Sequence, residues 1–237
     1  MTVMILIIAA CSSSDDAASP ASTAPPPAPT TTTATTAAPT TTSGNAQSLT
    51  DDEALAISGD YIDAFNSGDA DAVLALFTDD VALSDKYSAL SDFGNGDPFE
   101  AMDRAFFEQE LAWNTAQGTT FVSPECAVIE EGAAAAVTVS CEFGFLPAEL
   151  KAADAPPIPA VITMVVTPDG ISELASEVAV LDASGVVQFD NWLFLNHMDD
   201  SQGVEYGDWN SVAEAEQGGT LRAQYAQEWA ASLEANS

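Results

Sequence analysis

Alternation of apolar and polar residues predicts strands in the second half of the sequence. Residues 137, 139, 141, 143 and 145 are Val, Val, Cys, Phe and Phe, with Thr, Ser, Glu and Gly between them. This period of two is typical of a half-buried strand. The segment AVITMVV (160–166) is almost continuously apolar, as in a strand with both faces covered. We expect further strands over residues 119–122, 125–129 and 171–180.

Helical spacing of apolar residues comes before these strands. Thr50 and Glu53 match the S/T-x-x-E capping box, so a first helix begins there and stops at the Asn-Ser-Gly sequence 66–68. Its apolar face carries Leu55, Ile62 and Phe65, with Ile57 and Tyr61 beside them.

Shorter elements follow the first helix. Asp69 caps a predicted second helix, and a short strand covers residues 81–84. A third helix is expected to begin at Asp97, because Pro98 would then occupy the first helical position.

Helices followed by antiparallel hairpins predict an α+β domain, which we place over residues 49–182. The tail, residues 183–237, returns to helical spacing and is predicted to be a helical C-terminal extension packed on the domain. Gly218 and Gly219 are expected to break it into two helices.

The N-terminal segment has a different composition. Residues 15–47 are almost entirely Ala, Ser, Thr and Pro, which bury too little surface to offset conformational entropy. We therefore predict a disordered linker over residues 11–48. The apolar run before it is about seven residues long, whereas a membrane-spanning helix needs about 20.

The end of that run, Ile8-Ala9-Ala10-Cys11, resembles the lipobox of bacterial lipoproteins. The resemblance implies that residues 1–10 are a signal peptide and that Cys11 is acylated. The domain would then be anchored by lipid on the extracytoplasmic face of the bacterial cell membrane. The alternative is a short soluble N-terminal tail.

The charge balance is strongly acidic. Four Lys and Arg residues face 37 Asp and Glu residues, a formal net charge of −33. Nucleic acid is excluded as a partner, because its binding needs Lys and Arg to displace counterions. A solvated acidic coat explains the excess, and a specific cationic partner is the alternative.

Two cysteines remain in the folded part. Cys126 and Cys141 flank a turn, and a pairing that places them opposite each other also places Val128 opposite Val139. A disulfide between them would stabilise the fold by roughly 3 kcal/mol. Two buried free thiols are the alternative.

The first predicted helices carry a recognisable motif. Residues 61–81 read Y-x-x-A-x-N-x-G-D-x-D-x-x-x-A-L-F-x-D-D-V, which resembles the start of the nuclear-transport-factor-2-like (NTF2-like) superfamily. That superfamily includes ketosteroid isomerase and polyketide-cyclase-like proteins, and the resemblance covers about residues 50–182. It implies a cone-shaped curved antiparallel sheet packed against the N-terminal helices, and dimers through the sheet. It does not fix a function, because these cones host enzymes and pure binders alike.

The resemblance to ketosteroid isomerase implies two catalytic residues. Tyr61 matches the oxyanion tyrosine on the first helix, and Asp85 matches the general base after the first strand. Val161 and Ile162 stand where that enzyme has a third, protonated aspartate. The alternatives are that Tyr61 is a core residue and that Asp85 is a solvated loop residue, held charged by Lys86.

Three functions stay open. The first is a binding module whose pocket holds a small apolar ligand or adjoins an envelope partner. The second is a proton-transfer enzyme of ketosteroid-isomerase type, and the third is a structural envelope protein whose pocket is filled. We expect no cofactor and no metal site, since His197 with Asp199 and Asp200 is a weak ligand set. The expected pocket residues are Ile57, Tyr61, Phe65, Phe106, Val139, Phe143 and Met164.

Overall fold

A single curved sheet organises the folded part of the chain. The computed structural model describes residues 48–95, 98–131, 136–180, 184–198, 204, 206–207 and 209–235, all within one compact unit, Asn45–Ser237. The predicted signal peptide, the linker and Cys11 lie outside these residues. The six strands lie in the order β2-β1-β6-β5-β4-β3, and β1 and β6 are parallel whereas the other neighbours are antiparallel. The strands are β1 (Phe77–Tyr87), β2 (Glu100–Met102), β3 (Thr120–Glu131), β4 (Val137–Leu146), β5 (Ile158–Thr167) and β6 (Gly170–Val178).

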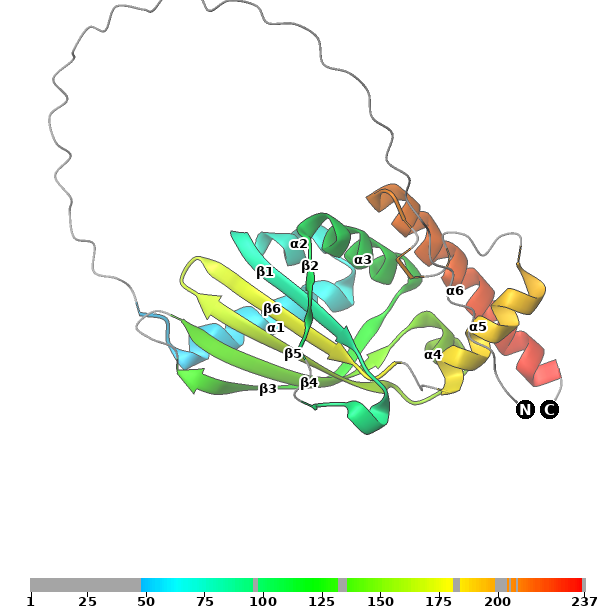
Figure 1. The fold of residues 1–237 in the computed structure, drawn as a ribbon, viewed down its shortest axis with the longest axis horizontal. Helices are drawn as coiled ribbons and strands as arrows, with labels where there is room; N and C mark the ends of the chain where they lie inside the picture. The colour runs from blue at the N-terminus through cyan, green and yellow to red at the C-terminus, as the bar shows by residue number, and fades with distance from the viewer. Residues whose placement is uncertain are drawn as a thin grey trace, which may run out of the picture. The chain divides into compact units, whose positions relative to one another are not determined.

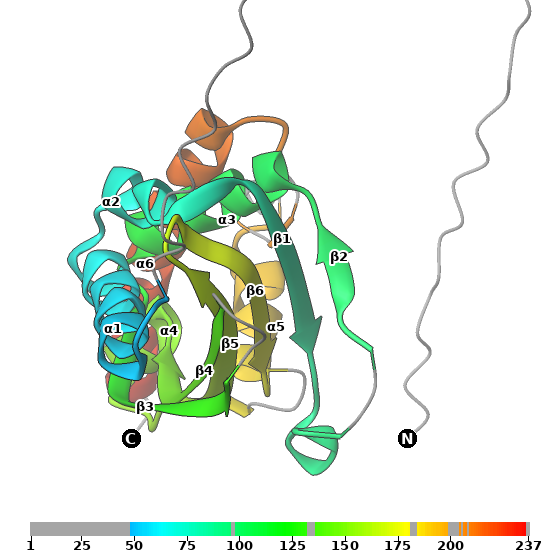
Figure 2. The same ribbon diagram turned by 90° about the vertical axis from the view of Figure 1, so that its left-hand side faces the viewer.

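Helices fill the inside of the curve and one end of the sheet. Figure 2 shows the sheet curling around α1, and Figure 1 shows α4, α5 and α6 together at one end of the strands. This is the predicted α+β class with a helical C-terminal extension. Among the described residues, no helix is both long and apolar enough to cross a membrane. The helices are α1 (Asp51–Ser67), α2 (Ala70–Ala75), the 3-10 turn η1 (Leu90–Asp92), α3 (Arg104–Gln117), α4 (Ala148–Ala152), α5 (Ser184–Asn196) and α6 (Val212–Ala235).

Helix α1 has the predicted cap and the predicted buried face. The backbone N–H of Thr50 donates to the Glu53 carboxylate at 2.9 Å, and the Thr50 hydroxyl accepts from the Glu53 N–H at 3.3 Å. At the other end, the Asn66 side chain donates to the Phe121 carbonyl at 3.0 Å and accepts from the Phe121 N–H at 2.7 Å. The rings of Phe65 and Phe121 stack at 3.9 Å between centroids. These contacts hold α1 against β3 and fix the inner wall of the cone.

The β3–β4 hairpin has the register that was predicted from the cysteine pair. Cys126 lies opposite Cys141, Val128 lies opposite Val139, and a disulfide joins the two cysteines. The prediction of a disulfide is confirmed.

The third helix begins later than predicted. Its N-cap is Asp103, whose carboxylate accepts from the Phe106 N–H at 2.8 Å. Residues Glu100–Met102 instead form the edge strand β2, which pairs with Leu83–Asp85 of β1. The predicted start at Asp97 is therefore wrong, although Asp97 itself lies outside the described residues. Pairing with the sheet outweighed the local helix-start signal.

The predicted break at Gly218 and Gly219 is also wrong, because α6 continues through both glycines. Both are buried, and a Cβ on Gly219 would collide with the carbonyl oxygen of Trp113 in α3. A glycine inside a helix usually weakens it, but here it lets two helix backbones approach closely. The glycine therefore fixes how the C-terminal extension packs on the domain.

Gly219→Ala is expected to lower the free energy of unfolding by about 1–3 kcal/mol, because the added methyl group meets backbone that cannot move aside. Gly59→Ala is the matched control, since Gly59 lies inside α1 and a Cβ added there would have no atom within 4 Å. That substitution should stabilise the protein by about 0.5–1 kcal/mol. Urea denaturation measures both, and equal stability of the two variants would contradict the packing argument.

Candidate functional site

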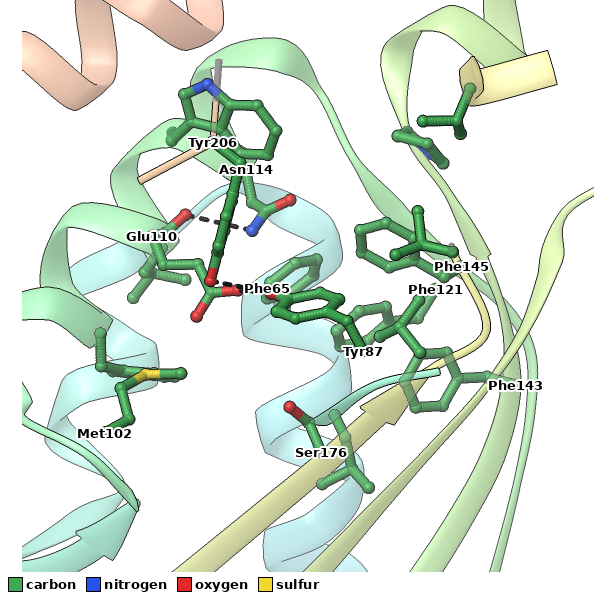
Figure 3. A pocket seen from close by; sticks show the side chains of 18 of the residues that line it. Phe65, Tyr87, Met102, Glu110, Asn114, Phe121, Phe143, Phe145, Ser176 and Tyr206 are labelled. Carbon is green, nitrogen blue, oxygen red and sulfur yellow. Dashed lines mark hydrogen bonds between the residues drawn. The ribbon is translucent and has the colours of Figure 1, made fainter. Parts of the chain in front are cut away.

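A cavity of about 460 Å³ lies between the sheet and the helices. Its walls come from α1, α3, the inner face of the sheet and the C-terminal extension. Most of the lining is apolar, and Figure 3 shows Phe65, Phe121, Phe143 and Phe145 gathered on one side. The rings of Phe121 and Phe143 lie 4.2 Å apart between centroids. An apolar molecule in this space would be covered by aromatic rings.

One wall of the cavity is polar. The Tyr87 hydroxyl donates to Oε1 of Glu110 at 2.7 Å, and the hydroxyls of Tyr87 and Tyr206 lie 2.8 Å apart (Figure 3). Tyr87 ends β1, Glu110 lies on α3, and Tyr206 belongs to the segment between α5 and α6. The three side chains line the cavity. We call them the Tyr87–Glu110–Tyr206 cluster.

The environment of the cluster changes its acidity. Burial raises the pKa of Glu110 to about 7, although hydrogen bonds from Tyr87 and Tyr206 act in the opposite direction. Burial and then the nearby Glu110 carboxyl raise the pKa of both tyrosines well above the ordinary value. The tyrosines are therefore hydroxyl donors, and Glu110 is the group that changes charge near neutral pH.

A second set of polar side chains lines the cavity where α4, α5 and α6 meet. Arg222 of α6 is buried and pairs with Glu149 of α4 at 2.6 Å and with Asp190 of α5 at 3.0 Å. Its guanidinium lies 4.9 Å from the Phe189 ring centroid and 5.4 Å from that of Trp113. The C-terminal extension thus forms part of the cavity.

Of the two residues expected to be catalytic, Tyr61 lines the cavity and Asp85 does not. Tyr61 is buried and lines the cavity, and burial followed by the charge of Glu110 raises its pKa. Asp85 lies on β1 opposite Glu100 and Ser176 and is not among the lining residues. Burial followed by the charge of Glu100 raises its pKa.

Asp85 lies within strand β1, so the alternative that it is a solvated loop residue is wrong. Lys86 does not serve as its counter-ion, because successive residues of a strand point to opposite faces. Lys86 instead pairs with the buried Glu177 at 3.2 Å.

The residues expected in the pocket separate into three groups. Phe65 and Phe143 line the cavity together with Tyr61. Val139 and Met164 belong to the buried core and are 0% exposed, and the partly buried Ile57 packs against that core. Phe106 packs outside the lining against Tyr206 and Trp209.

Other expectations concern the tail. His197 lies 3.4 Å from Glu228 and packs on the Tyr225 ring at 4.0 Å between centroids. Asp199 and Asp200 lie outside the described residues, among which no group of three or more His, Cys, Asp or Glu residues could hold a metal ion. Trp192 and Trp229 pack on Phe189 and are not among the cavity-lining residues.

No family model and no curated protein matches the chain. Among solved structures, the chain is similar to a SnoaL-like protein of unknown function from Burkholderia thailandensis, with 18% identity, 56% of this chain and 99% of that chain covered, and a TM-score of 0.39. It is also similar to an NTF2-like protein of unknown function from Cytophaga hutchinsonii, with 11% identity, 56% and 92% covered, and a TM-score of 0.33. A third similar structure is a cystatin-like protein of unknown function from Methylobium petroleophilum, with 13% identity, 59% and 84% covered, and a TM-score of 0.41. At such identity the likeness concerns the fold alone.

Glu110→Gln is expected to change how stability depends on pH. The pKa of Glu110 is raised from 4.5 to about 7 in the folded protein, so ionisation costs folding free energy as the pH rises through this window. Glutamine does not ionise. The variant should therefore gain about 1–3 kcal/mol relative to the parent between about pH 4.5 and about pH 8. Urea denaturation across this range measures the gain.

The control for this prediction is Glu216→Gln, which removes an exposed carboxylate from α6. Its stability relative to the parent should stay nearly constant with pH. The same pH profile for both variants would contradict the raised pKa of Glu110.

Proposed function

Because helices packed into a curved sheet give the described residues the NTF2-like fold, we propose that this protein is a binding module that holds a small apolar ligand. The observation that carries the proposal is the cavity of about 460 Å³, lined by aromatic rings with one polar wall. Sites for small molecules are typically apolar clefts of about 300–1,000 Å³ with a few convergent polar groups. This cavity has that size and that arrangement.

The aromatic lining supplies affinity and the polar wall supplies orientation. Burial of about 200 Å² of apolar ligand surface would contribute roughly 5 kcal/mol. The Tyr87–Glu110–Tyr206 cluster would receive the polar end of the ligand, because a buried polar group needs a hydrogen-bond partner. A ligand with an apolar body and one polar end fits both requirements.

A lipid anchor completes the proposed function. Acylation of Cys11 would tether the domain to the extracytoplasmic face of the cell membrane, with residues 12–48 as a spacer. The disulfide between Cys126 and Cys141 supports this extracytoplasmic location, because disulfides persist in oxidising compartments.

A proton-transfer enzyme of ketosteroid-isomerase type is the second candidate. The observation that favours it is the Tyr61 side chain on the cavity wall, where a hydroxyl could donate to a developing enolate oxygen. Asp85 would have to reach the substrate from its place on β1, beside the cavity lining. If the protein is such an enzyme, a carbonyl compound bound in its cavity should exchange a C–H proton for deuterium in deuterated water. The exchange is expected with the parent protein and not with Asp85→Asn.

Native mass spectrometry of the protein isolated from its own membrane tests the binding proposal. A bound small molecule is expected in the parent and should be lost from Ser176→Trp, since Ser176 lines the cavity and the indole would occupy it. Thr163→Trp is the control, because Thr163 lies on the neighbouring strand β5 and is not a lining residue. Equal retention by both variants would place the ligand elsewhere, and an empty parent would contradict the proposal.

Cys11→Ser is expected to move the protein from the membrane fraction to the soluble fraction, because the acylated thiol is removed. Fractionation and metabolic labelling with a fatty acid measure this, with Cys126→Ser as the control that keeps the anchor. A variant that stays membrane-bound and labelled would overturn the lipid anchor.

A further inference from the structure

We propose that the cavity selects an organic cation, an apolar molecule that carries one ammonium group, and that Glu110 is the counter-ion of this group. The inference rests on the proposed binding function and names the chemical class of its ligand. Three observations on charge, rings and hydroxyl groups carry it.

The first observation is the charge of the cavity lining. Three carboxyl groups line it, from Glu110, Glu149 and Asp190, against one guanidinium, from Arg222. Arg222 is already paired with Glu149 at 2.6 Å and with Asp190 at 3.0 Å. The remaining carboxyl, Glu110, has hydroxyl groups for partners.

In the part of the chain that the structure describes, no cation is paired with Glu110. The sequence contains four Lys and Arg residues in all. Besides Arg222, Lys86 pairs with Glu177, Arg104 pairs with Glu108, and the Lys151 ammonium donates to a backbone carbonyl at 3.4 Å. Among the described residues, Glu110 forms no ion pair. A partly buried carboxylate without a counter-ion is destabilised, so a ligand cation would relieve that cost.

Aromatic rings of the cavity lining pack together at the hydroxyl partners of Glu110. The rings of Tyr87 and Tyr206 lie 5.3 Å apart between centroids, edge to face. Tyr206 also contacts Trp113, another lining residue, at 5.6 Å between centroids. Aromatic faces attract ammonium groups, even at partly exposed positions such as Tyr206.

The hydroxyl groups complement an ammonium donor. An ammonium group carries only donors, and hydroxyl oxygens and a carboxylate accept. The Tyr87 hydroxyl donates to Glu110, and the lone pairs that remain on the Tyr87 and Tyr206 oxygens can accept from an ammonium group together with the Glu110 carboxylate. A ligand carboxylate would instead bring a second negative charge beside Glu110, which is unfavourable at low dielectric.

The same arrangement makes binding depend on pH. The groups that face Glu110 are Tyr87 and Asp85 on β1, Tyr61 on α1 and Tyr206 before α6. Burial raises the pKa of Glu110 to about 7, and an ammonium ligand favours the ionised form. Affinity for the cation is therefore expected to fall as the pH drops below about 7.

Three probes that share one ring test the inference: 2-naphthylmethylammonium, 2-naphthylmethanol and 2-naphthoate. Calorimetric titration of the full-length protein at about pH 8 and in about 0.15 M salt gives the affinity and stoichiometry of each, with surface charges largely screened. The ammonium probe is expected to bind one site at least tenfold more tightly than the alcohol, and the carboxylate is expected not to bind. Glu110→Gln should lower the affinity ratio of the ammonium probe to the alcohol to about one.

Glu216→Gln is the matched control, because it removes one negative charge from the surface and leaves the cavity unchanged. Its preference for the ammonium probe should equal that of the parent. An ammonium preference that survives in Glu110→Gln would overturn the inference, since attraction to the acidic surface would then explain it. If the alcohol binds as tightly as the ammonium probe, the inference fails and the proposed cavity function stands. If no probe binds, both fail.

Discussion

The pairing of Arg222 with Glu149 and Asp190 joins α6 to α4 and α5 at the end of the sheet. A buried guanidinium is tolerated only when its charge is matched, and here two carboxylates and two aromatic rings match it. Gly219 lets α6 lie directly on the backbone of α3. Together these contacts hold the C-terminal extension over the cone, where Tyr206 reaches the cavity wall.

This use of Arg222 determines the electrostatics of the site. The chain has four basic residues, and the described structure places each of them in contacts that do not involve Glu110. Glu110 is therefore left with hydroxyl partners in a partly buried position, and desolvation raises its pKa. An acidic protein with few cations thus acquires a partly buried carboxyl group that a cationic ligand could neutralise.

The sequence predicted features that depend on local pattern. The capping box at Thr50, the β3–β4 register and the disulfide follow from spacing within short segments. It could not predict the site, because Glu110 is one of 37 acidic residues and Tyr206 lies 119 positions from Tyr87. The errors at Asp97 and at the glycine pair have the same origin: pairing with β1 and packing on α3 overrode local signals.

Glu110 is a partly buried carboxyl group that has no counter-ion among the described residues. The most direct test is a carbon-13 NMR titration of the Glu110 side-chain carboxyl, assigned by comparison with Glu110→Gln. The midpoint is expected near 7. A midpoint near 4.5, the ordinary value for glutamate, would show that the group is solvated or already paired, and Glu110 would then need no ligand cation.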